Sequence, residues 1–121
     1  MNTPLFAPPG GFRVRIHDLS GGAADGVVEE IGGFSTLMHA NAFARAYVRD
    51  SIERCRAPGC DAAAVLALWR QFGEDAEVLG GGAAAWHSAA EVARFAAEPA
   101  SPEERDWRAL DPRRLAGDDE T

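Results

Sequence analysis

Two short segments of this 121-residue chain hold its most reactive side-chain types. His17 is followed by Asp18 in one segment, and Glu74 by Asp75 in the other. A histidine beside carboxylates suits general acid–base catalysis, and a group of carboxylates suits a hard metal ion. These residues form a candidate site if the two segments lie side by side in the fold. The competing interpretation is structural: Asp18 starts a turn, and Glu74 and Asp75 accept hydrogen bonds from exposed backbone amides.

The residues before His17 alternate in polarity as a strand does. Phe12, Val14 and Ile16 are apolar, with an arginine between each pair of them. This period of two predicts a strand with one buried face. Glycine, serine and aspartate are frequent over residues 20–26, which favours a turn. Residues 27–31 then suit an antiparallel return strand.

Two helices are predicted after this hairpin. The first starts at an N-cap on Ser35 or Thr36 and runs to about Cys55. A proline and a glycine then interrupt the chain, and Asp61 is a typical N-cap for the second helix. Gly73 is typical of the C-terminal cap that ends it. The acidic candidate residues therefore follow directly after a helix end.

The second helix carries one apolar stripe. Val65, Leu68, Trp69 and Phe72 occupy positions i, i+3, i+4 and i+7. This spacing is typical of residues that face a core, so we expect Trp69 and Phe72 to pack inside the protein.

A third strand and a third helix complete the predicted elements. The segment of residues 76–79 is short and mostly apolar, as is typical of a strand. Ser88 and Glu91 have the spacing of a capping box, which predicts a helix from there through Phe95 to about Ala97.

Together the elements predict an α+β fold. We expect a small antiparallel sheet of two or three strands packed against two or three helices, in the order β-β-α-α-β-α. Residues 1–11 are predicted to be a flexible N-terminal segment, because they are rich in proline and glycine. Residues 12–97 form the single α+β domain. Residues 98–121 form an acidic C-terminal tail, in which the sequence from Ser101 to Glu104 is typical of a helix start.

The order of these elements resembles a family of small uncharacterised bacterial α+β domains. That family has V-R-V-H-D near its start, where this chain has residues 14–18. It has an alanine-rich helix beginning F-x-T, matched here at Phe34 and Thr36, and it has F-G-E-D after its second helix, matched at residues 72–75. The resemblance spans roughly residues 12–97. It implies a fold and carries no activity.

Composition and charge narrow the classes of function. The net charge is −7, and every basic residue is an arginine. Residues 98–121 alone carry eight acidic residues and four arginines. An acidic surface disfavours nucleic-acid binding, since phosphates are held by basic patches. Nothing in the sequence is typical of a signal peptide or a membrane span, so we expect a cytoplasmic protein without a membrane partner.

Two cysteines allow a metal site to be drawn. Cys55 and Cys60 with His39 or His87 would supply zinc ligands. Zinc sites usually show tighter paired spacing, and Cys55 also falls on the apolar stripe of the first helix. We therefore expect no metal and no cofactor.

Two tryptophans lie outside the clean apolar stripes. Trp86 and Trp107, with Leu110, are candidates for a partner-binding surface, because aromatic side chains that a small core does not absorb often mark a contact. The alternative is that they pack the C-terminal segment over the domain.

Three functions are compatible with these observations. The first is a non-enzymatic module that binds another protein or itself through the tryptophans and the acidic tail. The second is a small enzyme or ligand-binding domain that uses His17 and Asp18 with Glu74 and Asp75. The third is an acidic inhibitor that imitates nucleic acid, which requires a regular surface array of carboxylates.

Overall fold

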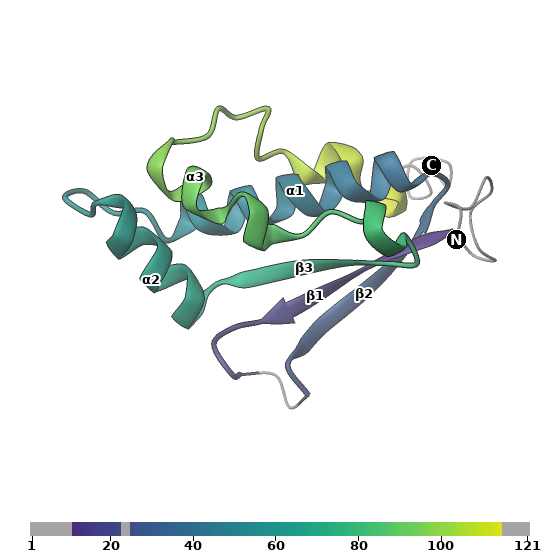
Figure 1. Cartoon of the computed structure of the whole chain (residues 1–121), viewed down its shortest axis with the longest axis horizontal. Helices are drawn as coiled ribbons and strands as arrows, with labels where there is room; N and C mark the ends of the chain where they lie inside the picture. Colours follow the sequence, from purple (N-terminus) through teal and green to yellow (C-terminus); the bar gives the residue numbers. More distant parts are fainter. Residues whose placement is uncertain (1–10, 23–24, 115–121) are drawn as a thin grey trace.

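The computed structural model describes residues 11–22 and 25–114. They form an α+β fold in which a three-stranded antiparallel sheet lies under a layer of helices (Figure 1). Its strands are β1 (Phe12–Asp18), β2 (Val27–Phe34) and β3 (Glu74–Leu79), in the order β2-β1-β3. The predicted fold class is confirmed. Most of the predicted N-terminal segment and the end of the acidic tail lie outside the described residues.

The alternation that predicts β1 also places it at the centre of the sheet. Phe12, Val14 and Ile16 are at most 3% exposed and belong to the core. The side chains between them point to the other face of the sheet, because successive residues of a strand alternate. There Arg13 and Arg15 both contact the carboxylate of Glu30 on β2, at 3.2 and 3.0 Å.

The first helix, α1 (Leu37–Arg54), provides most of the core on the covered face of the sheet. It begins at Thr36, whose hydroxyl accepts a hydrogen bond from the amide of His39 at 3.1 Å. Six of its residues join the hydrophobic core: Ala40, Phe43, Ala44, Tyr47, Val48 and Ile52.

The second helix, α2 (Ala62–Phe72), begins as predicted, with the Asp61 carboxylate accepting from the amide of Ala64 at 2.8 Å. Trp69 is 4% exposed, which agrees with its predicted place in the core. The same prediction is wrong for Phe72, which is 61% exposed. Phe72 is the last residue of α2, one turn beyond the point where the core ends at Trp69.

Gly73 ends α2 for a different reason from the one its type suggests. Its φ is −85°, so the backbone is not in the left-handed region that usually favours glycine at a helix end. Instead the indole of Trp69 packs against it. A Cβ added to Gly73 would lie 2.3 Å from Trp69 Cδ1. Glycine is needed here for space.

The third helix, α3 (Val92–Ala97), starts later than predicted. Residues Ser88–Ala90 form a short 3₁₀ helix (η2) before it, and the side chain of Ser88 caps nothing. The predicted capping box does not form, because the carboxylate of Glu91 instead binds Arg45 on α1 at 2.7 Å. Arg45 binds the carboxylate through two N–H groups, at 2.7 and 3.0 Å, which a single backbone amide does not match.

The segment after α3 returns across α1. Ser101 and Glu104 exchange hydrogen bonds as a capping box does, at 2.9 and 3.3 Å, yet only one turn follows. The chain then forms a 3₁₀ helix, Trp107–Leu110 (η3), which contacts α1.

Candidate functional site

β1 and β3 pair directly, and this pairing places the four predicted site residues at the same end of the two strands. The two strands are antiparallel, with His17 opposite Asp75 and Asp18 opposite Glu74. The condition that the sequence analysis placed on the site, namely neighbouring strands, is therefore met.

The alternation of the strands nevertheless separates the four side chains. Residues directly opposite each other share a face of the sheet, and the next pair points to the other face. Glu74 is on the helix side, where its carboxylate accepts a hydrogen bond from the Tyr47 hydroxyl of α1 at 2.5 Å. His17 and Asp75 are on the open side. The four residues thus do not converge on one point.

Asp18 and Asp75 also accept hydrogen bonds close to their own positions. The Asp18 carboxylate accepts from the amide of Ser20 at 2.8 Å, which shapes the turn after β1. Asp75 accepts at 2.8 Å from the amide of Ala76, on the outer edge of β3. These contacts correspond to the structural interpretation of the acidic residues.

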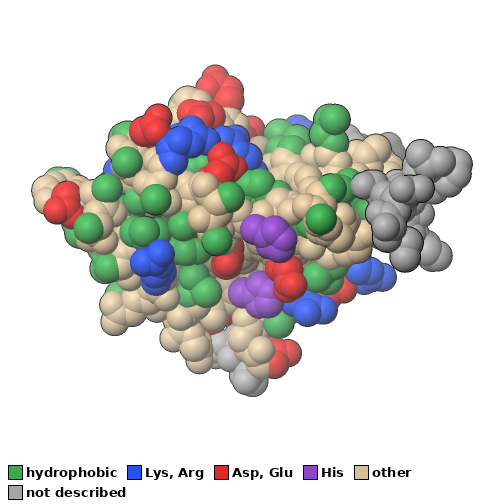
Figure 2. All heavy atoms as spheres, viewed as in Figure 1, with side chains coloured by type: hydrophobic (Ala, Val, Ile, Leu, Met, Phe, Trp, Pro, Cys, Tyr) green, Lys and Arg blue, Asp and Glu red, His purple; other side chains and the backbone are tan. Residues whose placement is uncertain are grey.

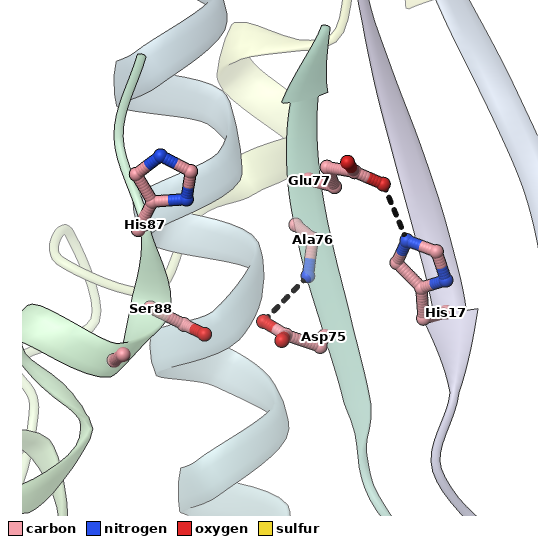
Figure 3. Close-up of a pocket in the computed structure, with 7 residues that line it drawn as sticks. His17, Asp75, Ala76, Glu77, His87 and Ser88 are labelled. Carbon is pink, nitrogen blue, oxygen red and sulfur yellow. Dashed lines mark hydrogen bonds and ion pairs between the residues drawn. The ribbon is translucent and has the colours of Figure 1, made fainter. Parts of the chain in front are cut away.

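A polar hollow of about 310 Å³ lies where His17 and Asp75 meet the outer edge of β3. Figure 2 shows two histidine side chains on this face with acidic side chains beside them. In the close-up, His17 and Glu77 point toward each other across the two strands, while His87 and Ser88 approach from the other side of β3 (Figure 3). The hollow is lined by His17, Asp75, Ala76, Glu77, His87, Ser88 and Ala89.

One close contact organises this hollow. His17 Nε2 lies 2.9 Å from Glu77 Oε1. The sequence analysis did not select Glu77, although it is two residues after Asp75 and therefore shares its face of β3. Ser88 is the first residue of η2 and His87 precedes it, and no pattern in the sequence indicates that this turn lies beside β3.

The hollow is suited to a small polar molecule rather than to a metal. Across residues 11–22 and 25–114, no group of three or more histidine, cysteine or acidic side chains is placed to hold a metal ion.

Cys55 and Cys60 are free thiols, and partial burial raises the pKa of Cys55. A raised pKa lowers the fraction of reactive thiolate at neutral pH.

Trp107 and Leu110 pack onto α1. The Trp107 ring lies 4.9 Å from the ring of Tyr47 and 6.0 Å from that of Phe43. Its indole N–H donates to Asp50 Oδ2 at 3.1 Å. The carbonyl of Leu110 lies 2.6 Å from a ring nitrogen of His39. Much of this predicted contact surface therefore faces the protein's own core.

Trp86 is likewise held within the domain. Its indole N–H donates to the Glu91 carboxylate at 2.7 Å, and its amide donates to Asn41 at 2.9 Å. The side chain is half-buried against the core. One part of it remains open to solvent.

The outer side of α2 is a further surface that the sequence analysis did not single out. Eight consecutive residues, 62–69, are uncharged, but in α2 only Val65 and Trp69 are buried. Hydrophobic side chains gather over this end of the molecule, at the left of Figure 2. By helical spacing, the exposed residues Ala63, Ala67, Arg70 and Gln71 share the side of α2 away from the core, and the exposed Phe72 projects from nearly the opposite side at the last turn. The α2 surface is defined here as the exposed end of the helix, residues 70–72.

A second hollow of about 300 Å³ adjoins the α2 surface. Phe72 forms one side of it, and Arg54 and Cys55 at the end of α1 form another. Arg70 has no ion pair within the part of the chain that the structure describes, but residues two apart on a helix project about 200° from each other, so Arg70 faces away from Phe72. The exposed aromatic ring and the hollow therefore lie together.

Comparison with protein-family models, with curated proteins and with solved structures found no match to this chain. No helix within the described ranges has the length and apolar character needed to cross a bilayer.

Proposed function

We propose that the protein is a non-enzymatic interaction module that binds another protein, or a second copy of itself, through the α2 surface. The observation that carries this proposal is the exposure of Phe72. This residue is 61% exposed, and it belongs to a helix with few buried residues. A helix that is apolar on most sides is usually covered on most sides. Here the domain covers one side only.

The composition of the α2 surface supports this use. Aromatic side chains and arginines are enriched in the buried core of protein interfaces. Phe72 is of the first type, and Arg54, which lines the hollow beside it, is of the second. The hollow beside Phe72 offers space for one apolar side chain of the partner.

The four residues of the predicted catalytic site give less support to an enzyme. Glu74 is hydrogen-bonded to Tyr47, and Asp18 and Asp75 accept bonds from amides near their own positions. Each of these carboxylates therefore has a structural use.

Replacement of Phe72 by aspartate tests the proposal. Tagged wild-type protein and Phe72→Asp are compared for solution mass over a range of concentrations and for copurification from an extract of the source cells. Met38→Asp is the matched control, because Met38 is 81% exposed on another helix, α1. We expect Phe72→Asp to lose a complex that wild type and Met38→Asp both form. A complex that survives Phe72→Asp unchanged, or monomers without partners in all three proteins, contradicts the proposal.

The polar hollow favours one second candidate, a ligand-binding or enzymatic domain that uses His17 with Glu77. The supporting observation is that two histidines, two acidic residues and a serine line one hollow. Native mass spectrometry of protein purified from the source cells tests it. A small molecule that is retained by wild type and lost in His87→Ala supports this function, and bare protein in both contradicts it.

A further inference from the structure

Helix α1 buries charged side chains under the C-terminal segment. Arg49 is 2% exposed, Asp50 is 6% exposed, and the side chain of Glu53 is 7% exposed. Charges are costly to remove from water unless they are paired and hydrogen-bonded. The partners of these groups therefore decide how firmly the segment above them is held.

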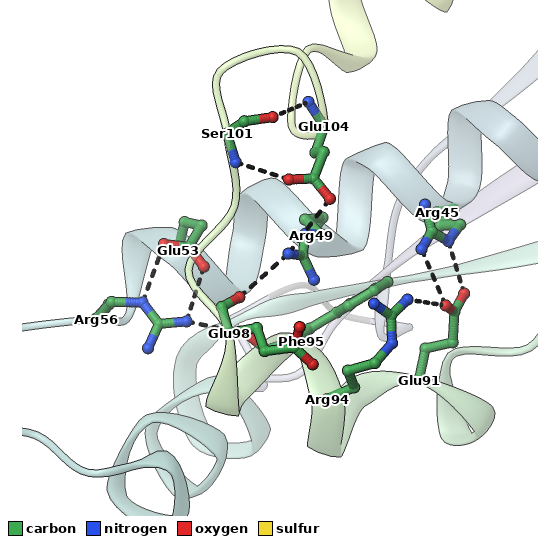
Figure 4. A network of polar contacts seen from close by, with 10 residues as sticks. All are labelled: Arg45, Arg49, Glu53, Arg56, Glu91, Arg94, Phe95, Glu98, Ser101 and Glu104. Atoms are coloured by element: carbon green, nitrogen blue, oxygen red, sulfur yellow. Dashed lines mark hydrogen bonds and ion pairs between the residues drawn. The ribbon is translucent and has the colours of Figure 1, made fainter.

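We call residues 98–106 the strap. It arches over α1 and α3, and its contacts with α1 are polar (Figure 4). Arg49 Nη2 donates to the Glu98 carbonyl at 3.1 Å and lies 3.5 Å from the Glu104 carboxylate. At its end, Arg105 Nε donates to Asp50 at 2.7 Å.

Arg49 is incompletely satisfied by these contacts. A guanidinium has five N–H donors, and the contacts of Arg49 to Glu98 and Glu104 both use Nη2. Its Nε and Nη1 are buried with no hydrogen-bond partner in the described part of the chain. The guanidinium lies 4.5 Å from the centre of the Phe95 ring, which offsets only part of this deficit.

Two more arginines share the same ring. The guanidinium carbons of Arg45 and Arg94 lie 5.3 and 5.6 Å from the centre of Phe95. Both contact Glu91, at 2.7 and 2.6 Å. Three positive groups therefore surround one aromatic ring, and a single carboxylate at short distance serves two of them. The third, Arg49, reaches a carboxylate among the described residues only at long distance, 3.5 Å to Glu104.

The strap is anchored by polar contacts and not by buried side chains. None of the residues from Ala97 to Asp106 is buried. Lifting the strap therefore exposes little apolar area, and it lets water reach the unpaired donors of Arg49. Segments held by few apolar contacts open at lower free energy than the core of a protein.

We propose that Arg45, Arg49 and Arg94 around Phe95 form a binding site for an acidic peptide segment, which the chain's own strap occupies in this structure. The ligand class follows from the present occupant, which offers Arg49 a backbone carbonyl and a carboxylate. A partner peptide with a better placed carboxylate would satisfy the two unpaired donors. This site lies on α1 and α3 and is independent of the α2 surface.

Hydrogen exchange of the intact protein tests whether the strap opens. We expect amides of residues 98–106 to exchange faster than those in the middle of α1. Arg105→Gln removes the contact to Asp50, so in this variant the exchange rate of the strap amides should be about tenfold higher than in wild type. Arg114→Gln is the matched control, because this arginine is exposed and has no ion pair among the described residues. Strap amides as protected as those of α1 overturn the proposal.

Binding of a synthetic peptide with the strap sequence, residues 97–106, tests the ligand class. The probe competes with the tethered strap, so we expect it to bind Arg105→Gln about tenfold more tightly than wild type. The same peptide with Glu104→Gln should lose most of this binding, and so should the native peptide on Arg105→Gln/Arg49→Gln. Equal binding of both peptides, or tighter binding of inorganic phosphate than of the peptide, overturns the assignment. These results do not depend on Phe72, so they separate this site from the proposed function.

Discussion

Asp50 is the residue on which the C-terminal segment depends most directly. Its carboxylate is 6% exposed and accepts from Arg105 at 2.7 Å and from the Trp107 indole at 3.1 Å. Arg54, one turn later on α1, lies 2.9 Å away. A buried carboxylate is stable when several donors satisfy it. If the carboxylate is removed, those buried donors are left without an acceptor.

Asp50→Ala should therefore lower the free energy of unfolding by about 1–3 kcal/mol, since buried donors lose their acceptor. Asp50→Asn is the control, because it keeps one acceptor oxygen and should cost less. Urea unfolding followed by circular dichroism measures both. Equal stability of Asp50→Ala and wild type would contradict this role.

Glu91 links stability to pH. Hydrogen bonds from Arg45, Trp86 and Arg94 outweigh desolvation and lower the pKa of Glu91 to about 2. Because the folded-state pKa is below the unfolded one, the stabilisation is fully present above the unfolded value. It is lost as the pH falls from about 5 toward the folded pKa.

We therefore expect the melting temperature of wild type to fall between about pH 5 and pH 2 more steeply than that of Glu91→Gln, which has no carboxylate to titrate. Differential scanning fluorimetry across this range measures the slope for each protein. Parallel slopes would show that Glu91 does not carry this dependence.

At the scale of elements, the sequence predicts those parts of the fold that follow from local rules. Alternation identifies β1, and the caps at Thr36 and Asp61 identify the starts of α1 and α2. The start of α3 is not predictable in this way, because Glu91 is taken by Arg45, a residue 46 positions earlier. Contacts between distant segments override the local signal at this point.

The candidate site was predictable only in part, for a similar reason. The apolar patterns identify the two strands that carry or adjoin His17 and Asp75, but they leave open whether these strands pair, and the structure shows that they do. Because successive residues of a strand point to opposite faces, Glu74 is separated from Asp75, and Glu77 shares the face of Asp75. This part of the site follows from the sequence once β3 is known to be a strand. The position of His87 depends on a turn whose packing against β3 no local pattern determines.

Gly73 offers a test of an element boundary. Gly73→Ala should lower the free energy of unfolding by about 1–3 kcal/mol, because the added Cβ overpacks the site against the Trp69 indole. The backbone angle itself is one that alanine tolerates. Gly73→Ala in a Trp69→Ala background is the control, since alanine has neither the Cδ1 nor the Nε1 atom that the added Cβ would meet. Thermal or urea unfolding gives the comparison, and an equal loss in both backgrounds would contradict the steric cause.

At the scale of the whole molecule, the helices formed by residues 11–22 and 25–114 cover one face of the sheet. Its other face carries charged pairs such as Arg13 and Arg15 with Glu30. The C-terminal segment completes the covered side, where Trp107 packs on Phe43 and Tyr47. That segment is thus part of the folded unit.

Deletion of residues 98–121 should destabilise the domain, because it uncovers the aromatic rings of Phe43 and Tyr47 and removes two donors from Asp50. We expect a lower melting temperature and more binding of a hydrophobic dye than in wild type. Deletion of residues 115–121 alone is the control and should preserve both properties. A full deletion that melts like wild type would contradict this account.

The central position of β1 has a consequence for synthesis. On one side β1 pairs with β2, which follows it closely in the sequence. On the other side it pairs with β3, where the partner of Arg13 is Leu79, a residue that is synthesised much later. At ribosomal rates of about 5–20 residues per second, the nascent chain spends a few seconds with that edge of β1 unpaired. During translation, the segment most prone to join a neighbouring polypeptide is therefore β1, which emerges before the other two described strands.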